Sequence, residues 1–551
     1  MAATARGEMI RGAPAWLWAV ALFLGALAAF WPGQTTIPPS DRDEARFAQA
    51  SRQMLETGDL VDIRFQDDAR HKKPAGIYWL QAAAAAVAGG PDDAPIAAYR
   101  VPSWIGAAAA AALTAWATAP LVGWPAALLA GALLAATPLL GVEARIAKTD
   151  AALLAAILTA MGALARLRIA PGRTAMARLF WAAIGAGALL KGPIVLIPVL
   201  GALGWSIAAE RGLAPLRGLR PLEGVALALL IAAPWYVAIT LATDGAFWGA
   251  SLGEDMLGKV ATGREAHGAP PGLYLAIFWG TAWPMAVLAP IGAVWLWRRR
   301  ATWEGRFLLG WIVPTWLLFE LVATKLPHYP LPAYPAIAAA AAAAIFADDP
   351  SALPRWAWRI LLAVFALPAA AIPLGAALAP VAIEGTVSSG AVALALAAAP
   401  LLWLAGRALA ERRLARFAAF AAPGALIAQA AVFGFAIPAL DTAFPGPRMA
   451  EAVEARRCGP GPVVVSGYRE PSGVFALGTG TIHAGGEGAA EALAEGRAAL
   501  AFVERGDAQA FRAELARRGA AVEPLEMIEG FNYSKGDPVS LTLFRLEGAC
   551  D

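Results

Sequence analysis

The chain of 551 residues has a formal net charge of only +3; 59% of its residues are hydrophobic and 15% are charged. A soluble globular domain contains about 25% charged residues, so this composition excludes a large water-soluble protein and predicts a polytopic membrane protein. The arginines lie in short clusters between apolar segments, and nothing in the sequence suggests binding to nucleic acid.

We expect about thirteen membrane spans, each near the ~20 residues that a bilayer requires. The spans are expected at residues 13–31, 99–119, 123–142, 150–168, 178–190, 193–209, 223–242, 272–297, 306–323, 330–347, 356–379, 389–408 and 414–438. The first one follows Arg6 and Arg11, and this pattern also fits a signal peptide.

The Ala-rich segment at residues 76–90 is too short for a span and is expected to be an interfacial or re-entrant helix. With that choice, the basic loops fall on one side of the membrane and the polar stretch at residues 35–79 falls on the other. The positive-inside rule then puts the N-terminus in the cytoplasm and the C-terminus outside.

The polar stretch at residues 35–79 interrupts the apolar sequence with two clusters of charge. The first cluster includes Asp43 and Glu44, at the start of an amphipathic helix of about four turns that ends near Gly58. Such acids also simply complement a helix dipole, which is the alternative explanation. The second cluster holds Arg70, His71, Lys72 and Lys73. Because charged groups beside a bilayer usually mark a polar site, we interpret the stretch as half of an active site.

Two motifs in this stretch resemble those of a known family. A D-E-x-R-F-A pattern starts at Asp43 and includes Glu44 and Arg46, and a K-P-x-G-x-Y-W pattern starts at Lys73 and includes Tyr78. Together they are similar to the motifs of the bacterial aminoarabinose transferases of lipid A and the related galacturonosyl transferases. These enzymes belong to the protein mannosyltransferase-like group of GT-C glycosyltransferases. The resemblance implies a mainly α, polytopic fold with an uncleaved first span.

Three further polar turns fall on the same outer face of the predicted topology. Asp150 follows Thr149 at the start of a span, where an N-cap role is the alternative. Lys191 lies in a K-G-P turn that resembles the family, although a lysine there also reaches the headgroups by snorkelling. Lys325 and Tyr329 belong to a K-L-P-x-Y-x-L-P-like run, for which a proline-kinked turn is the alternative.

The loop at residues 244–271 is polar and glycine-rich, as expected of a lid beside a site. In the family, a loop of this kind with a basic residue and a histidine borders the donor pocket. The resemblance therefore adds Arg264 and His267 to the candidate site.

The resemblance implies an inverting transfer of a sugar from a polyprenyl phosphate to lipid A or another envelope glycolipid. The departing phosphate needs cations, and the candidates are Lys73, Arg70, Lys72, Arg264 and Lys325, with Tyr329 beside them. Asp43 would be the base or would position the acceptor, with Glu44 and Asp150 as further catalytic acids. Arg46, Tyr78, Lys191 and His267 complete the candidate site.

The sequence departs from the family pattern at Lys72, where many relatives have an acid before the conserved lysine. That acid helps to hold a divalent metal in relatives, so its loss puts a metal site in doubt, and no cofactor is expected with certainty. The change also makes the pocket more cationic, which suits a more anionic donor sugar or acceptor.

From about residue 441 the chain becomes polar, with strand-like runs at 462–467, 498–504 and 539–546 and helical stretches between them. We expect a membrane-embedded catalytic domain at 1–440, including an outer loop at 32–98 with interfacial helices, and a small α/β domain at 441–551. The only cysteines, Cys458 and Cys550, flank the strands of this second domain and are expected to form a disulfide, with two unpaired thiols as the alternative.

The resemblance implies a monomeric, multi-pass protein of the bacterial inner membrane, surrounded by membrane lipids, with the site and the C-terminal domain in the periplasm. Two alternatives stay open. The same fold also glycosylates protein Ser and Thr side chains, and polytopic chains are often transporters. Transporters usually carry charges in the middle of broken spans, whereas here the charges gather on one face, which argues against transport.

Overall fold

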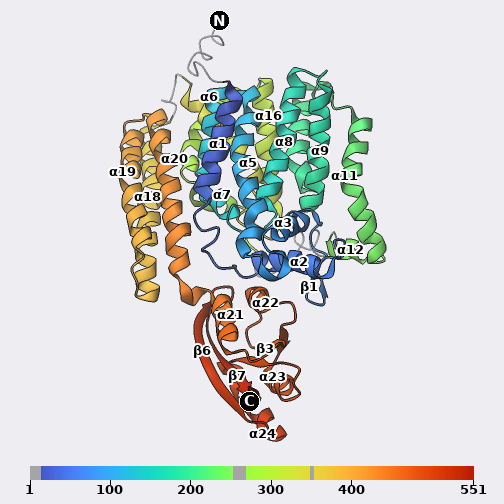
Figure 1. Ribbon diagram of the computed structural model, residues 1–551. Coiled ribbons are helices and arrows are strands. Elements are labelled where there is room, and N and C mark those ends of the chain that lie inside the picture. The colour runs from blue at the N-terminus through green and yellow to red at the C-terminus, as the bar shows by residue number, and fades with distance from the viewer. Residues whose placement is uncertain (1–13, 252, 254–267, 348–352, 551) are drawn as a thin grey trace.

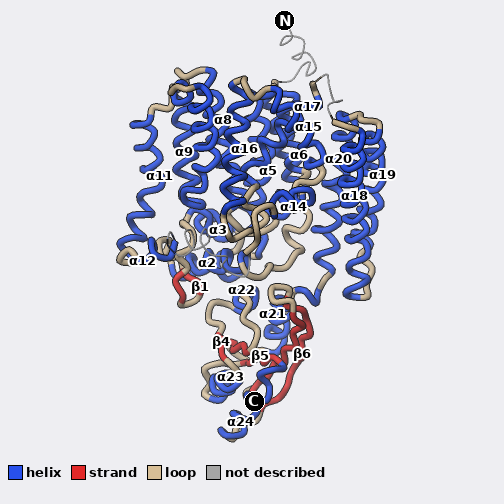
Figure 2. Tube along the Cα trace, turned by 180° about the vertical axis from the view of Figure 1, so that it is seen from behind, coloured by secondary structure: helices blue, strands red, loops and turns tan. Residues whose placement is uncertain are grey.

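The computed structural model describes residues 14–251, 253, 268–347 and 353–550. A layer of roughly parallel helices forms most of the molecule, and a smaller domain with a β-sheet lies beyond one end of these helices (Figure 1). Short helices and a two-stranded sheet lie between the two parts (Figure 2).

The apolar, alanine-rich segments of the sequence form the helical layer. Its principal helices are α1 (Ala15–Phe30), α5 (Ile96–Val122), α6 (Trp124–Ala135), α7 (Pro138–Glu143), α8 (Asp150–Ile169), α9 (Thr174–Lys191), α10 (Leu196–Glu210), α11 (Pro221–Ala242), α14 (Leu273–Thr281), α15 (Met285–Arg298), α16 (Trp303–Leu321), α17 (Tyr334–Ile345), α18 (Arg355–Glu384), α19 (Ser389–Ala410) and α20 (Leu414–Ala431). The short α12 (Ala246–Trp248) follows α11 at one end of this layer (Figure 1). The predicted mainly helical fold is confirmed.

Among the described residues, seven helices are long and apolar enough to cross a membrane, or eight if α14 and α15 form one span. The chain is thus a multi-pass membrane protein, while the predicted number of spans stays a prediction. The segment expected as one span at residues 272–297 is instead bent by 119° between α14 and α15. Pro284 precedes α15, and a proline at this place disfavours a continuous helix.

Small residues let the helices approach closely, as is typical inside membranes. Gly106 of α5 lies against α8, where an added Cβ would be only 2.7 Å from the backbone nitrogen of Ala152. The contact fixes the start of α8, and therefore Asp150, against α5.

The polar stretch forms α2 (Asp43–Thr57), β1 (Arg64–Phe65), β2 (Asp68–Ala69), α3 (Gly76–Val87) and α4 (Gly90–Asp93). These elements lie at the end of the helical layer that faces the C-terminal domain (Figure 1). As predicted, α2 ends at Gly58, which is left-handed and donates its N–H to Met54. The Ser51 hydroxyl of α2 donates to Gln81 of α3 at 2.8 Å, so the two short helices are joined.

The C-terminal domain contains α21 (Pro445–Arg456), β3 (Val463–Ser466), α22 (Pro471–Leu477), β4 (Ile482–Ala484), α23 (Gly486–Ala494), β5 (Leu500–Glu504), α24 (Ala508–Arg518), β6 (Val522–Asn532) and β7 (Asp537–Leu546). The sheet order is β4-β3-β5-β7-β6, with β3 parallel to β4 and β5 and with β7 antiparallel to β5 and β6. The short β4 and the edge strand β6 are not predicted by the sequence pattern, because many residues of β6 are exposed and the strand lacks regular alternation.

Cys458 and Cys550 are joined by a disulfide with their Cα atoms 5.5 Å apart, so the predicted bridge is present. It ties the chain just after α21 to the residues that follow β7. The beginning and the end of this domain are therefore held together.

Candidate active site

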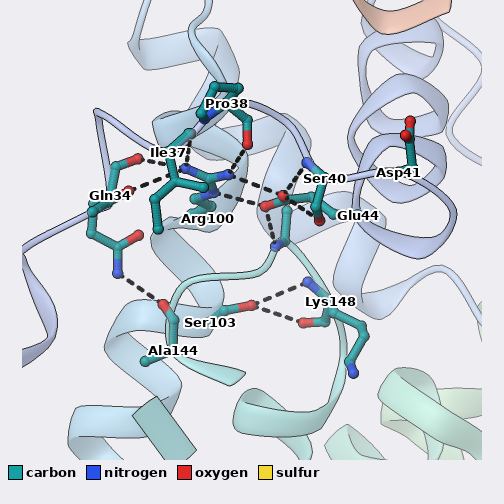
Figure 3. Close-up of polar contacts among 12 residues, drawn as sticks. Gln34, Ile37, Pro38, Ser40, Asp41, Glu44, Arg100, Ser103, Ala144 and Lys148 are labelled. Atoms are coloured by element: carbon teal, nitrogen blue, oxygen red, sulfur yellow. Dashed lines mark hydrogen bonds and ion pairs between the residues drawn. The ribbon is translucent and has the colours of Figure 1, made fainter. Parts of the chain in front are cut away.

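Glu44 forms a closed ion pair with Arg100 on α5 beside the first turn of α2 (Figure 3). The Glu44 carboxylate accepts from Nε of Arg100 at 2.7 Å and from Nη2 at 3.0 Å. It also accepts from the backbone N–H groups of Ser40 at 2.8 Å and Ala147 at 3.0 Å. Burial raises the pKa of Glu44, but the Arg100 charge and these hydrogen bonds outweigh burial and hold that pKa below its ordinary value.

Arg100 satisfies its remaining donors with backbone carbonyls of the loop before α2. Its guanidinium donates to Gln34 at 2.9 Å, Ile37 at 2.7 Å and Pro38 at 3.0 Å. Its side chain is fully buried. The network therefore joins the first loop, α2, α5 and the segment before α8, and Glu44 lines neither of the cavities described below. We assign Glu44 a structural position rather than a catalytic one.

Asp43 precedes Glu44 in the chain but is exposed and lines a polar cavity together with Arg46. Because Glu44 is held by Arg100, the start of α2 has one orientation, and Asp43 faces the cavity.

Asp150 is the centre of a second ion-pair cluster. Its carboxylate lies 2.6 Å from Nζ of Lys191, 3.6 Å from Nζ of Lys148 and 3.7 Å from Nε2 of His328. Lys148 also pairs with Glu143 at 2.9 Å. Ser103 of α5 hydrogen-bonds both backbone groups of Lys148, so α5 positions this cluster as well (Figure 3).

Three members of this cluster were missed as site residues from the sequence. Glu143 and Lys148 lie in the same E-A-R-I-A-K-T-D segment as Asp150, and His328 lies between Lys325 and Tyr329. The signal that could have found them is the rarity of charged groups at a membrane edge. Histidine adds to that signal, since the chain has only 4.

Glu143, Asp150 and His328 offer three ligand atoms within 4.8 Å of one another, a group that could hold a metal ion. However, Nζ of Lys148 lies 2.9 Å from Glu143, 3.3 Å from Nδ1 of His328 and 3.6 Å from Asp150. An ammonium group therefore already occupies the centre of the three ligands and would repel a divalent cation. These residues fit a lysine better than a metal, and we derive no step through a metal.

The glycine of the K-P-x-G-x-Y-W motif brings two candidate lysines together. A Cβ on Gly76 would lie 2.7 Å from the carbonyl oxygen of Leu189, so only glycine allows α3 to begin against the end of α9. Lys73 and Lys191, which flank this contact in the chain, line the same two cavities.

Tyr78 and Arg70 are hydrogen-bonded to each other beside the polar cavity. Nε of Arg70 donates to the Tyr78 hydroxyl at 3.1 Å, and its guanidinium lies 4.9 Å from the Phe47 ring centre. Both side chains are buried, and Arg70 also lines the polar cavity. Tyr78 is thus a positioning residue for Arg70.

Lys325 lines neither cavity. Its ammonium donates to the carbonyl groups of Phe319 at 2.9 Å, Glu320 at 2.5 Å and Val322 at 2.6 Å. These are carbonyls at the end of α16, which a helix leaves without partners of its own. The neighbouring candidate Tyr329 does line both cavities. Arg264 and His267 lie outside the described residues.

Two cavities meet at this site. An apolar cavity of about 170 Å³ is walled by residues such as Leu153, Ile194, Tyr236, Trp248 and Phe319. A polar cavity of about 700 Å³ lies beside it. Their linings share six residues, which we call the junction: Lys72, Lys73, Asp150, Lys191, His328 and Tyr329.

The polar cavity is strongly cationic, with nine lysines and arginines against four acids. The cations are Arg42, Arg46, Arg70, Lys72, Lys73, Lys148, Lys191, Arg469 and Lys535, and the acids are Asp43, Asp68, Asp150 and Glu470. Such a surface selects an anionic occupant.

The helices and the C-terminal sheet together define a class, which is a multi-pass membrane protein of the GT-C fold. The fold is that of ArnT from Cupriavidus metallidurans. Its structure bound to undecaprenyl phosphate superposes with a TM-score of 0.75 at 17% identity, over 97% of this chain and 99% of that one. The apo structure gives a TM-score of 0.72 at the same 17% identity, over 96% of this chain and 97% of that one.

Residues 40–244 match the family described as dolichyl-phosphate-mannose-protein mannosyltransferase. The undecaprenyl phosphate-alpha-4-amino-4-deoxy-L-arabinose arabinosyl transferase of Enterobacter sp. (strain 638) is 32% identical over 180 residues, which are 32% of this chain and 32% of that protein. The transferase of the same name from Edwardsiella ictaluri (strain 93-146) is 34% identical over 158 residues, 28% of each chain. The alignment thus covers less than a third of the length of these relatives. The predicted resemblance is confirmed: residues 40–244 match the protein mannosyltransferase family, and the fold is ArnT-like.

Proposed function

We propose that this protein is a glycosyltransferase that moves a sugar from undecaprenyl phosphate to lipid A. The sugar we propose is 4-amino-4-deoxyarabinose. The observation that carries the proposal is the junction, where an apolar cavity and a cationic polar cavity share lysines. A lipid-linked donor needs such a pair of environments, since its chain is apolar and its phosphate is charged. The choice of undecaprenyl phosphate as the carrier follows the names of the relatives and of the ArnT structure bound to it.

The donor's chain enters the apolar cavity, and its phosphate binds Lys73, Lys72 and Lys191 at the junction. In a single displacement, an acceptor oxygen attacks C1 of the sugar while the bond from C1 to the phosphate oxygen breaks. The configuration at C1 inverts and undecaprenyl phosphate departs with the electron pair. Cations held in place beforehand stabilise the charge that grows on the departing phosphate.

Asp43 faces the polar cavity and orients the acceptor or stabilises positive charge on the sugar ring. An acceptor phosphate is already ionised and needs little proton removal, whereas a hydroxyl acceptor needs a base. Asp150 pairs with Lys148 and Lys191 and so positions these cations rather than acting as a free acid.

A protein hydroxyl acceptor is the second candidate, since the matching family is described as protein mannosyltransferases. The excess of cations in the polar cavity favours an anionic lipid over a neutral Ser or Thr side chain. The sugar and the acceptor are therefore tested together.

The transfer experiment uses the purified chain in nanodiscs with lipid A and undecaprenyl-phosphate-linked aminoarabinose. Mass spectrometry should find lipid A increased by one aminoarabinose residue together with free undecaprenyl phosphate. Parallel reactions contain a galacturonic acid donor or a Ser/Thr-rich peptide acceptor. Transfer to the peptide and not to lipid A would reverse the choice of acceptor, and no transfer by folded protein that binds undecaprenyl phosphate would refute the proposal.

We also propose that the protein lies in the bacterial inner membrane with the site and the C-terminal domain in the periplasm. The basic loops at the opposite end and the Cys458–Cys550 disulfide support this orientation. Reporter fusions after Arg299 and at Asp551 should report opposite compartments. The same compartment for both would contradict the orientation.

A further inference from the structure

The C-terminal domain forms part of the wall of the polar cavity. It contributes Arg469, Glu470 and Lys535 to the lining, and we call these three residues the roof. These residues come from the loop after β3 and from the turn between β6 and β7. All other lining residues belong to the membrane part of the chain. The site is therefore shared between two regions that are far apart in the sequence.

Specific contacts hold both loops against the start of α2. The Asp41 carboxylate accepts from the N–H of Ser472 at 3.3 Å and from the Tyr468 hydroxyl at 3.4 Å, which fixes the first loop. The Tyr533 hydroxyl accepts from the N–H of Asp41 at 2.5 Å, which fixes the second loop. Arg42 adds a hydrogen bond of 2.5 Å to the carbonyl oxygen of Ser534.

The two cations of the roof have no neutralising partner within the described parts of the chain. Arg469 and Lys535 are exposed, and neither side chain forms an ion pair or hydrogen bond with another described residue. The nearby acid Glu470 is buried and instead accepts from the side-chain amide of Asn532 at 3.0 Å. The roof thus presents two positive charges to the cavity.

These cations lie on the domain side of the cavity, whereas the junction lysines line the apolar cavity as well. Of the cations that line the polar cavity, only Lys72, Lys73 and Lys191 also line the apolar cavity, so the donor phosphate uses the junction. The second set of cations, which the C-terminal domain contributes, is then available to a different anion. Arginine binds a phosphate as a fork, and lysine binds it as a point charge.

We propose that Arg469 and Lys535 form a binding site for a phosphate group of the acceptor, so that the C-terminal domain selects a phosphorylated glycolipid. The inference rests on the proposed glycosyl transfer and names the chemistry of its acceptor. It gives the C-terminal domain a direct role in specificity. The acceptor phosphate bound to the roof leaves the reacting oxygen free to face Asp43 and the junction.

The test compares Arg469→Ala/Lys535→Ala with Arg512→Ala, a matched change of an exposed arginine on α24 that lines neither cavity. The KM for lipid A should rise about tenfold or more in the double variant, because each lost charge-assisted contact weakens binding. The KM for the donor and the melting temperature should stay as in Arg512→Ala. An unchanged KM for lipid A in the double variant would overturn the inference.

A direct binding measurement separates this inference from the proposed transfer. Native mass spectrometry of the protein in nanodiscs should show that wild type prefers lipid A to enzymatically dephosphorylated lipid A. The double variant should lose this preference. If wild type transfers no sugar but shows the preference, the proposed transfer fails and the phosphate site stands. If wild type has no preference, the phosphate site fails whatever the transfer assay gives.

Discussion

Two ion-pair clusters border the site, and they differ in what surrounds them. The Glu44–Arg100 cluster is sealed from solvent, since the Glu44 side chain is 1% exposed and the Arg100 side chain is 0% exposed. The Asp150 cluster with Lys148, Lys191 and His328 opens onto both cavities. Oppositely charged side chains therefore serve two purposes: a closed pair fixes the backbone, and an open cluster presents charge to a ligand.

The sealed cluster should be the more sensitive to mutation of one partner. Replacing Arg100 with Ala leaves the buried Glu44 carboxylate unpaired, and loss of one partner of a buried pair costs about 3–5 kcal/mol. We expect Arg100→Ala to lower the melting temperature in detergent and to reduce accumulation of the protein in membranes. Asp43→Asn is the control, since Asp43 is exposed and its change should leave the melting temperature unaltered. Equal melting temperatures for Arg100→Ala and wild type would show that the cluster does not hold the fold.

On the open side, Asp43→Asn should reduce turnover about a hundredfold or more while the protein still inserts, because a positioned acid typically contributes that much. The Asn side chain keeps the size and loses the charge. Transfer of sugar to lipid A by the purified variant is the measurement. Wild-type turnover by folded Asp43→Asn protein would remove Asp43 from the site.

Within the junction, Lys73→Ala should impair use of the donor more than Lys72→Ala. Both residues line both cavities, but Lys73 is the lysine of the K-P-x-G-x-Y-W motif and is half-buried, whereas Lys72 is exposed. A less hydrated cation interacts more strongly with phosphate. We expect about a tenfold difference in kcat/KM measured as a function of donor concentration. Equal losses, or a greater loss for Lys72→Ala, would contradict this order.

The smallest expected effect concerns the contact between the two regions. Burial raises the pKa of Asp41 to about 6 from an ordinary value of 3.8, the Glu470 charge raises it further, and hydrogen bonds from Ser472 and Tyr468 oppose the rise. Because the folded protein binds this proton more tightly, the stabilisation is full below pH 4 and is lost as the pH rises through 6.

Asp41→Asn should remove this pH dependence while keeping an acceptor for the Ser472 N–H. Wild type should gain about 1 kcal/mol of stability from pH 7 to pH 5 relative to the variant. Thermal unfolding at both pH values measures the difference. If wild type and variant change in parallel between these pH values, proton binding by Asp41 does not contribute to the contact.

Several features follow from the sequence without reference to tertiary contacts. The apolar composition demands helices, because a bilayer leaves backbone groups no partner other than their own helix. The helix over α2 with acids in its first turn, its end at Gly58 and the bridge between the only cysteines were predicted from local patterns and cysteine number. Membrane-edge lysines and acids predicted a site at one end of the bundle, and Asp43, Lys73, Asp150 and Lys191 line one cavity there.

Only the tertiary structure decided which of these charged residues face the cavity. Asp43 and Glu44 are adjacent and chemically alike, but neighbours on a helix point about 100° apart, so one meets Arg100 of α5 and the other meets open space. Lys325 looked like a phosphate ligand, yet it caps the carbonyls at the end of α16. Arg469 and Lys535 carried no local signal, because what brings them to the site is the packing of their domain against Asp41, far away in the chain.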